Sequence, residues 1–367
     1  MTTPASPSPR SRASSAGDEH VGGADDESVP DEARVLAGRT PEQRTAARAA
    51  RERRHEQRRR RRRVRRVRRV LIIVLVVLAL VATTVLVWLR YTFGGLERIP
   101  GALPEGADTP GTTILLVAAD PGAHDRVAAG PRWRQALEHS DLVMLVHLPA
   151  DRADGVFAVS VPGSVTLPGT GRLGSTAAAG GAAYVRALER TTGVHIDRLA
   201  VWDLNAVREI VDELDGVTVS LGDGCAQAGA QRLDGQGALE VMRLRPCLPR
   251  GDLDRVARQQ AVLRALLART VDGGVLVNPL RLNRVAKSTF DHLAVNADWS
   301  LWDIARTAWS LRGTTPRSTT FLTAPTRRTH SGLVLDHRRA AELWQALRSD
   351  RLGEYVALNR DVVAGSR

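Results

Sequence analysis

Hydrophobic residues are distributed very unevenly over the first hundred positions of the chain. Residues 1–50 are rich in Ser, Pro, Gly, Ala and charge, a composition typical of disordered segments. An almost continuous arginine run follows from Arg51 to Arg69. Val70 to Leu89 then forms a stretch of twenty residues without a charge, long enough to cross a bilayer as a helix. The pattern predicts a disordered basic tail at residues 1–69 and a transmembrane helix at residues 70–89.

The flanks of this apolar segment predict its orientation. Trp88 and Tyr91 lie at its far end, as aromatic side chains do at membrane interfaces. The arginines before it favour the cytoplasmic side. A cleaved signal peptide would have a shorter apolar core nearer the N-terminus, and no small-residue cleavage site is obvious. We therefore predict a single-pass protein of the cell membrane, with a cytoplasmic N-terminus and an extracellular region at residues 90–367.

Beyond a linker at residues 90–110, short apolar runs alternate with amphipathic segments. The apolar runs predict strands at Thr113–Ala118, Asp141–Leu148, Gly155–Val161, Leu199–Trp202, Val217–Leu221 and Thr319–Leu322. The amphipathic segments predict helices at Thr176–Thr192, Asn205–Leu214, Leu253–Val271, Trp299–Leu311 and His337–Leu347. Strands alternating with helices predict an α/β fold whose sheet is covered on both faces.

The formal net charge of +12 belongs mostly to the tail. Residues 1–69 carry a net charge of +9 and the rest of the chain only +3. A nucleic-acid partner for the folded part is therefore not expected. We interpret the arginine run as an orientation signal that also rests on anionic lipid headgroups, with nucleic-acid binding as the alternative.

The stretch from Arg243 to Gln260 is the main candidate for chemistry, because it holds five arginines, two aspartates and two glutamines. From Asp252 onward its spacing is helical, so Asp252, Arg255 and Gln259 fall on one face. Planar guanidinium groups suit a phosphate or pyrophosphate. A solvated, salt-bridged helix face is the alternative interpretation of such a charge run.

The chain has two cysteines, Cys225 and Cys247, both in the part predicted to be extracellular. Outside the reducing cytoplasm such a pair is expected to form a disulfide, with two unrelated thiols as the alternative. No His or Cys partners stand at zinc spacing, so metal ligation by this pair is not expected.

A series of motifs along the chain resembles the LytR-CpsA-Psr family over residues 111–350. The motifs, in order, are an apolar strand ending in Asp120, Ser140-Asp141 before a strand, Ser160-Val161-Pro162 at a strand end, Gly180-Gly181 at a helix start, Val211-Asp212-x-x-x-Gly216-Val217, Arg243-x-Arg245, and Gly251-Asp252-x-x-Arg255-x-x-Arg258-Gln259-Gln260. The resemblance implies an α-β-α sandwich with a central mixed sheet and an apolar tunnel for a polyprenyl chain. It leaves residues 351–367 as a C-terminal tail.

The resemblance also implies a function. It indicates a membrane-anchored phosphotransferase that moves a glycopolymer from a polyprenyl-pyrophosphate carrier to peptidoglycan. The implied cofactor is Mg²⁺, held by Asp120 and Asp141, and the implied catalytic residues are Asp252 and Arg255. The implied pyrophosphate-binding set is Arg243, Arg245, Arg255, Arg258 and Gln259. The implied partners are the lipid-linked glycan, peptidoglycan and the lipid membrane.

Three positions depart from the family pattern, because Gly122, His139 and Gly163 stand where the family usually has arginine. A guanidinium at position 163 would neutralise charge on the scissile phosphate, and one such donor is worth about a hundred- to a thousandfold in rate. The arginines considered as replacements are Arg126, Arg132 and Arg134. A Gly163→Arg variant is then expected to raise turnover, unless Gly163 has a positive φ.

These departures leave two alternative functions. The chain would be a catalytically degenerate homologue that binds polyprenyl-phosphate lipids, or an envelope-sensing transcription attenuator whose arginine tail contacts DNA. His139, beside Asp141, is a candidate base, although a lone histidine is more often structural.

Overall fold

The computed structural model describes residues 41–104, 109–119, 131–221, 229–244, 250–272, 274–275, 278–330 and 332–363, with side chains from residue 67 onward. The chain divides into two compact units, the first ending at Ala82 and the second beginning at Thr83.

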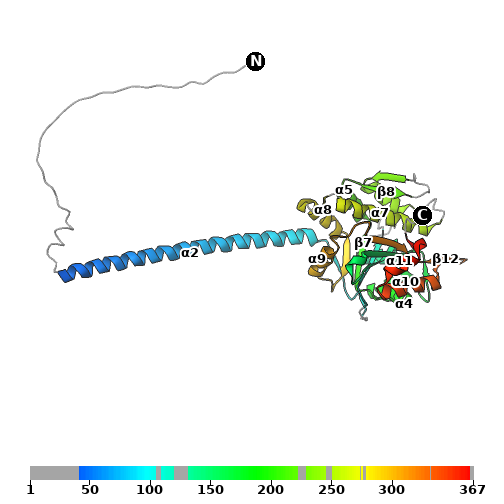
Figure 1. Ribbon diagram of the computed structural model, residues 1–367, viewed down its shortest axis with the longest axis horizontal. Helices are drawn as coiled ribbons and strands as arrows, with labels where there is room; N and C mark the ends of the chain where they lie inside the picture. The colour runs from blue at the N-terminus through cyan, green and yellow to red at the C-terminus, as the bar shows by residue number, and fades with distance from the viewer. Residues whose placement is uncertain are drawn as a thin grey trace, which may run out of the picture. The chain divides into compact units, whose positions relative to one another are not determined.

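The first unit consists, in its described part, of one long helix. Helix α2 spans Pro41–Phe93, and its last residues belong to the second unit (Figure 1). Residues 41–69 are therefore helical rather than disordered, because Ala, Arg, Glu and Gln dominate this stretch and all favour helix. Within α2, Val67–Phe93 is long and apolar enough to cross a membrane, with a mean hydropathy of 3.3 in its most apolar window. The span predicted at residues 70–89 lies inside it.

The second unit is organised around a seven-stranded mixed sheet in the order β1-β10-β7-β2-β3-β4-β11. Its strands are β1 (Glu97–Ile99), β2 (Thr112–Ala119), β3 (Leu142–Leu148), β4 (Val156–Val161), β7 (Arg198–Asp203), β10 (Leu293–Asn296) and β11 (Thr319–Thr323). The central strand β2 is parallel to β7 and antiparallel to β3, and β3 is in turn antiparallel to β4. The start of β3 therefore lies at the same edge as the ends of β2 and β4.

Helices and two small sheets surround the central sheet. The helices are α3 (Arg132–Glu138), α4 (Gly181–Thr192), α5 (Asn205–Glu213), α6 (Gly235–Arg243), α7 (Asp252–Asp272), α8 (Pro279–Phe290), α9 (Leu301–Ser310), α10 (His337–Arg348) and α11 (Leu352–Leu358). Short 3₁₀ helices form at η2 (Arg152–Asp154), η3 (Leu173–Ala179) and η5 (Arg360–Val362). The small sheets are β12 (Thr326–Thr329), β13 (Gly332–Leu335), β5 (Thr166–Leu167) and β6 (Gly171–Arg172), and the hairpin of β8 (Val217–Leu221) and β9 (Gly229–Leu233).

The sheet is covered by helices on both faces, as the alternation of its side chains requires. Leu115 and Val117 of β2 join a buried cluster with α4, α10 and α11. Leu116 and Ala118 point to the other face, where the cluster includes residues of α5, α6 and α7. The two groups of helices lie on opposite sides of the strands in Figure 1. The predicted α-β-α sandwich with a central mixed sheet is thus confirmed.

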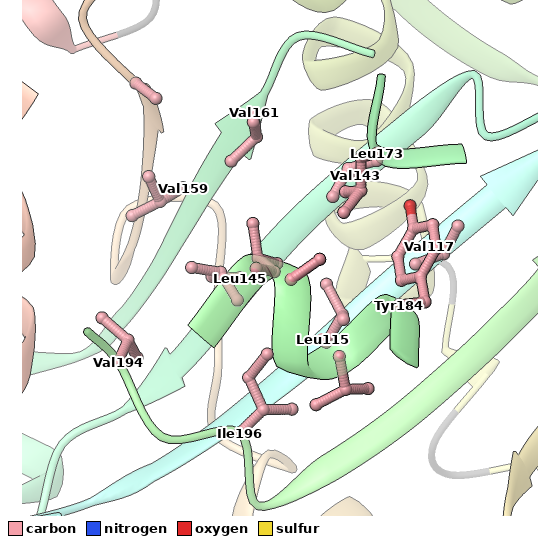
Figure 2. Packing of buried hydrophobic residues seen from close by; sticks show 14 of the residues in the cluster. Leu115, Val117, Val143, Leu145, Val159, Val161, Leu173, Tyr184, Val194 and Ile196 are labelled. Atoms are coloured by element: carbon pink, nitrogen blue, oxygen red, sulfur yellow. The ribbon is translucent and has the colours of Figure 1, made fainter. Parts of the chain in front are cut away.

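The helix predicted at Thr176–Thr192 begins later than expected, at Gly181. Residues Leu173–Ala179 form the 3₁₀ helix η3, and Gly180 then turns the chain with a φ of 97°. Gly181 packs so closely that a Cβ there would lie 3.2 Å from Ile99 Cγ2. Figure 2 shows the result: α4 presents Tyr184 to the sheet residues Leu115, Val117 and Val143. The described side chains of this layer pack on one another, and the apolar tunnel stays a prediction.

The folded unit extends beyond the predicted boundary at residue 350. Helix α11 buries Leu352 and Tyr355, η5 buries Val362, and Val363 forms a β-bridge with Leu322 of β11. These buried apolar side chains belong to the cluster that includes α4 and α10. The segment predicted as a C-terminal tail therefore completes the core as far as residue 363.

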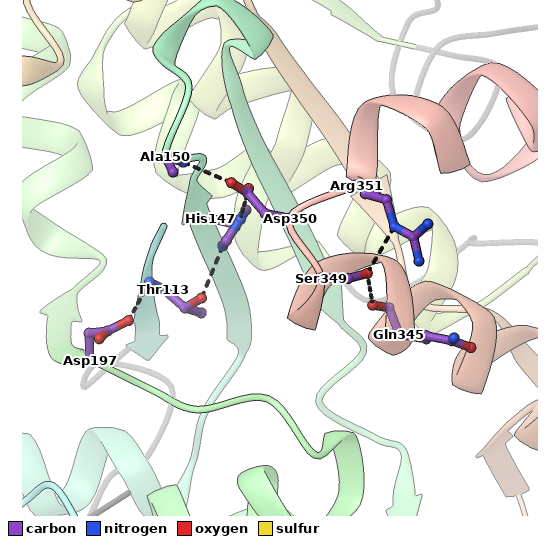
Figure 3. Close-up of polar contacts among 8 residues, drawn as sticks. All are labelled: Thr113, His147, Ala150, Asp197, Gln345, Ser349, Asp350 and Arg351. Atoms are coloured by element: carbon purple, nitrogen blue, oxygen red, sulfur yellow. Dashed lines mark hydrogen bonds and ion pairs between the residues drawn. The ribbon is translucent and has the colours of Figure 1, made fainter. Parts of the chain in front are cut away.

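A polar network anchors the end of α10 to the sheet edge opposite the start of β3 (Figure 3). The buried His147 ring hydrogen-bonds through Nε2 with Asp350 at 2.8 Å and through Nδ1 with Thr113 Oγ1 at 3.1 Å. The Ala150 N–H also donates to Asp350, at 2.9 Å. Asp350 holds these contacts from a left-handed backbone conformation, with a φ of 56°.

Candidate functional site

A pocket of about 460 Å³ opens at the edge of the sheet where β3 begins and β4 ends. Four segments of the chain meet there: the end of α3, the loop after β4, η3 and the start of α7. Their lining residues are Glu138, His139, Ser140, Asp141, Gly163, Ser164, Arg172, Gly174, Ser175, Gly251, Asp252 and Arg255. Three residues predicted from the sequence, Asp141, Asp252 and Arg255, are thus brought together.

Arg255 occupies the centre of the charged cluster in this pocket. Its Nη1 donates to Asp141 Oδ1 at 2.9 Å, and its Nη2 pairs with Asp252 Oδ1 one turn earlier on α7. The three side chains are only 12%, 11% and 13% exposed. Because partial burial weakens solvent screening, one guanidinium balanced by two carboxylates forms a strongly coupled group.

The second oxygen of Asp252 fixes the loop that follows β4. Asp252 Oδ2 accepts hydrogen bonds from Ser164 Oγ at 2.8 Å and from the Ser164 N–H at 3.2 Å. The Asp252 carboxylate therefore contacts both Arg255 and the loop. No pattern in the sequence points to this contact of Ser164.

Two consecutive glutamines attach α7 to the sheet. Gln259 is buried, and its Nε2 donates to the Asp141 carbonyl oxygen at 3.3 Å. Gln260 Nε2 donates to Ser160 Oγ of β4 and to the Leu322 carbonyl of β11, each at 2.8 Å. Gln259, predicted to bind pyrophosphate, thus lies where it supports the backbone of Asp141.

A buried tyrosine supports the other side of Asp141. Tyr184 of α4 is fully buried, and its hydroxyl donates to Ser140 Oγ at 3.0 Å. Burial raises the pKa of Tyr184 well above its usual value, so the phenol stays protonated and keeps donating. No local pattern in the sequence singles out Tyr184 for this contact.

The remaining arginines of the predicted pyrophosphate-binding set lie beyond the lining of this pocket or outside the described residues. Arg243 is the last residue of α6. Arg258 of α7 is 7% exposed, and its Nη1 makes no hydrogen bond within the part of the chain that the structure describes. Asp120, Arg245, Cys225 and Cys247 lie outside the described residues, so the predicted disulfide stays a prediction.

The structure corrects the expectation for Gly163. Its φ does not lie in the left-handed region, yet a Cβ at this position would lie 2.6 Å from the Ser140 carbonyl oxygen. That contact is with backbone, so a side chain at position 163 requires a backbone shift. The expectation that Gly163 tolerates arginine whenever its φ is negative is therefore wrong, because the close approach of two backbones sets the limit.

A different arginine from those considered reaches the pocket. Arg132 pairs with Glu97 at 2.9 Å, and Arg134 lies 5.5 Å from the Trp133 ring centroid; neither lines the pocket, and Arg126 lies outside the described residues. Arg172, the residue before η3, does line it. The sequence feature that could have indicated Arg172 is its place among the glycines of residues 169–174.

Of the two residues predicted to hold Mg²⁺, the described part of the chain contains Asp141. No group of three or more His, Cys, Asp or Glu that could hold a metal occurs among them. The carboxylate of Asp141 fits the oxygen ligands that Mg²⁺ prefers. The Asp141 N–H donates to the carbonyl of Ala118 at 2.9 Å, and Ala118 precedes the predicted second ligand, Asp120, by two residues.

Comparison of the chain with known proteins identifies a family and individual relatives. The family model described as the LytR_cpsA_psr family matches residues 101–349. The chain is 28% identical over 244 residues to the "Probable cell wall biosynthesis protein LcpB" of Corynebacterium glutamicum, covering 62% of this chain and 58% of that protein. It is 31% identical over 155 residues to "Cell wall biosynthesis protein LcpA" of the same organism, covering 40% and 29%. The chain thus spans less than two thirds of either relative.

Solved structures share the fold. The "LytR-Csp2A-Psr enzyme from Actinomyces oris" superposes with a TM-score of 0.56 at 21% identity, covering 69% of this chain and 96% of that one. Protein gbs0355 from Streptococcus agalactiae gives a TM-score of 0.52 at 16% identity, covering 66% and 88%. Since the family model covers more than half of the sequence, this chain belongs to the LytR-CpsA-Psr family.

Proposed function

We propose that this protein is a membrane-anchored phosphotransferase that moves a glycopolymer from a polyprenyl-pyrophosphate carrier to peptidoglycan. The observation that carries the proposal is the cluster of Asp141, Arg255 and Asp252 at the pocket, in a chain of this family. The names of the C. glutamicum relatives place those proteins in cell wall biosynthesis, which supports a role of the same kind here.

The pocket offers binding groups for a doubly charged phosphate group. Arg255 presents a planar guanidinium that can turn from its carboxylate partners to phosphate oxygens. The first turn of the 21-residue helix α7 adds the positive end of a helix dipole at the same place. Arg172, which also lines the pocket, supplies a second guanidinium that can replace the arginine missing at Gly163. Phosphoryl transfer depends mainly on such positioning and charge neutralisation.

Mg²⁺ is part of this proposal. Asp141, together with Asp120, would hold the ion, which would neutralise charge on the pyrophosphate oxygens. The residues around Asp141 keep its carboxylate in place: Gln259 binds its carbonyl oxygen, and Tyr184 holds the neighbouring Ser140. Asp252 orients Arg255 and the loop after β4, so we assign it a positioning role.

The lipid-binding homologue without efficient transfer remains the second candidate, because the arginine expected at Gly163 is missing. The two candidates differ in rate and share the pocket. If the protein is a phosphotransferase, wild-type protein transfers a labelled glycan from polyprenyl pyrophosphate to peptidoglycan. If it is a lipid-binding homologue, it binds the same lipid and transfers almost nothing.

The test uses the full chain in detergent micelles, with a labelled polyprenyl-pyrophosphate glycan and isolated peptidoglycan. Arg255→Ala is expected to weaken lipid binding by about 1.5–3 kcal/mol and to abolish measurable transfer. Arg250→Ala is the matched control, since Arg250 pairs with Asp254 on the exposed side of α7 and does not line the pocket. A chelator is expected to stop wild-type transfer. Arg255→Ala protein that binds and transfers like wild type would refute the proposed site.

A further inference from the structure

Helix α9 exposes an aromatic face that the proposed reaction does not use. Trp302 is 76% exposed and Trp309 is 67% exposed. They are seven residues apart, so they lie on the same side of the helix, with the exposed Ala305 and Arg306 between them. The opposite side is anchored in the core by the buried Ile304. The aromatic face is therefore held in place by a packed helix.

Two exposed tryptophans on one face of a helix indicate a surface that binds a partner. A tryptophan side chain buries roughly 150–250 Å² when it is covered, so leaving two in water forgoes a large hydrophobic gain. A tryptophan also carries a polar N–H at one end, which suits a boundary between apolar and aqueous phases.

Helix α9 lies close to the end of the candidate membrane span, within the same compact unit. Phe93, the last residue of α2, packs against Phe290 of α8 with ring centroids 4.6 Å apart. Thr92 Oγ1 donates to Asn283 Oδ1 of α8 at 2.8 Å, and Lys287 of α8 lies 4.9 Å from the Tyr91 ring centroid. The end of the span is therefore fastened to α8.

The chain then leads directly from the span to α9. Glu97 of β1 is four residues beyond Phe93, and four residues span at most about 14 Å. The next residue, Arg98, donates to the carbonyl oxygen of Trp299, two residues before α9. Leu96, Phe290 of α8 and Leu311 after α9 also pack against one hydrophobic cluster. The lipid headgroups around the end of α2 therefore lie within reach of α9.

The charges on this face favour an anionic surface. Arg306 stands between the two tryptophans, and the Arg312 guanidinium lies 4.3 Å from the Trp309 ring centroid. Asp303 pairs with Arg306 at 3.1 Å and balances its charge, so Arg312 carries the net positive charge of this face. A basic side chain near an anionic bilayer surface is attracted to it and strengthens binding. Helices that lie in the interface of a membrane typically combine Trp on the apolar face with Arg or Lys on the polar face beside it.

We propose that α9 is an interfacial membrane-binding helix, whose Trp302–Trp309 face inserts into the anionic headgroup region of the leaflet where α2 ends. The proposal rests on the membrane span and goes beyond the phosphotransferase function. One span alone leaves the domain free to tilt. A second contact through α9 fixes which side of the domain faces the lipid.

The experiment uses tryptophan fluorescence of the full chain in bilayers of phosphatidylcholine and phosphatidylglycerol with brominated acyl chains. The chain has seven tryptophans, of which Trp88 lies in the candidate span. In wild type, bromine is expected to quench Trp88, Trp302 and Trp309. The double variant Trp302→Ala, Trp309→Ala is then expected to retain roughly one third of the quenchable signal. Thermal unfolding in detergent checks that this surface change leaves the fold intact.

Two further comparisons make the outcomes distinct. Trp88→Phe tests the span by itself: an unchanged quenchable signal in this variant would mean that α2 is not in the bilayer. An unchanged quenchable signal in the double tryptophan variant would place α9 outside the lipid and overturn the proposal. If the emission from the α9 tryptophans is blue-shifted but not quenched, a protein partner or a second copy covers α9 instead of lipid. That result would also overturn the proposal. Equal quenching in pure phosphatidylcholine bilayers would overturn the role of anionic lipid.

Discussion

At the scale of single residues, the site is organised by the shared charge of Arg255. Asp141 and Asp252 both hold its guanidinium. The Asp252 carboxylate also accepts hydrogen bonds from Ser164 of the loop after β4, and the main-chain carbonyl of Asp141 accepts one from Gln259. Removing one member therefore disturbs the others, and effects of substitutions inside this cluster should not add. Arg172 lines the same pocket from the start of η3, outside this cluster, so its effect can be measured separately.

Arg172→Ala is expected to lower the transfer rate by about a hundredfold, because a donor aimed at the transferring phosphate is lost. The exposed position of Arg172 predicts a change in stability within about 0.5 kcal/mol. Arg186→Ala is the matched control, since Arg186 is an exposed arginine of α4 that does not line the pocket. Transfer assays on the three proteins decide the question. Equal rates for Arg172→Ala and the control would show that another group replaces the missing arginine.

Gly163→Ala is expected to destabilise the protein by about 1–3 kcal/mol, because the new Cβ would approach the Ser140 carbonyl oxygen within 2.6 Å. Gly163→Arg should suffer the same strain, so it does not simply restore the family's arginine. Gly313→Ala is the control, since a Cβ there meets nothing within 4 Å. Chemical unfolding of the full chain in detergent measures the difference, and equal stability of both alanine variants would contradict the packing argument.

At the scale of elements, ionic contacts join β7, α5 and the turn before β10. His292 lies between two carboxylates, with Nε2 3.0 Å from Glu209 Oε1 and Nδ1 3.6 Å from Asp203 Oδ2. The longer distance exceeds a hydrogen bond, so Asp203 acts through its charge. Asp203 foremost, and Glu209 after it, raise the pKa of His292, although burial opposes them.

The raised pKa gives a definite pH dependence. A folded pKa above the unfolded value of about 6.5 means that His292 stabilises the fold fully below that pH. The stabilisation disappears as the pH rises through the folded pKa and the imidazole loses its proton. Relative to His292→Gln, wild type should therefore lose stability as the pH rises above about 6.5. Urea unfolding midpoints measure this, and parallel pH profiles of the two proteins would disprove the link. Glu209→Gln should shift the loss to lower pH.

At the scale of the whole molecule, the parts that could be predicted are those with a strong local signal. The apolar runs of β2, β3 and β4 and the amphipathic pattern of α5 and α7 appear at nearly the predicted residues. β1, β10 and the pairs β5–β6 and β12–β13 are too short for a clear period, and their partners are distant in sequence. At the site, too, residues within one helix could be predicted, whereas residues that meet from distant segments could not.

Helical spacing sufficed to place Asp252, Arg255 and Gln259 on one face of α7. Ser164, Arg172 and Tyr184 reach the same site from three other elements, so only the tertiary arrangement shows their contacts. The C-terminal boundary predicted at residue 350 was wrong for a related reason. Helix α11 is short and weakly patterned, and only the packing of its apolar residues in the cluster with α10 and the sheet shows that it belongs to the core.

A truncation tests how far the folded unit extends. A chain ending at Asp350 loses Leu352, Tyr355 and Val362, which are 1%, 7% and 8% exposed. Each such side chain contributes roughly 1.5–3 kcal/mol through burial, so the loss is expected to reach about 4 kcal/mol or more. That loss approaches the whole stability of a domain at the low end of the usual range, roughly 5 kcal/mol, so the truncated protein should be strongly destabilised and readily degraded. A chain ending at Val363 keeps all three residues and the bridge to Leu322, and should unfold like the full chain.

Thermal unfolding followed by far-ultraviolet circular dichroism compares the three proteins. Full stability in the chain ending at Asp350 would mean that α11 is only an appendage, and that the boundary predicted from the sequence was the right one.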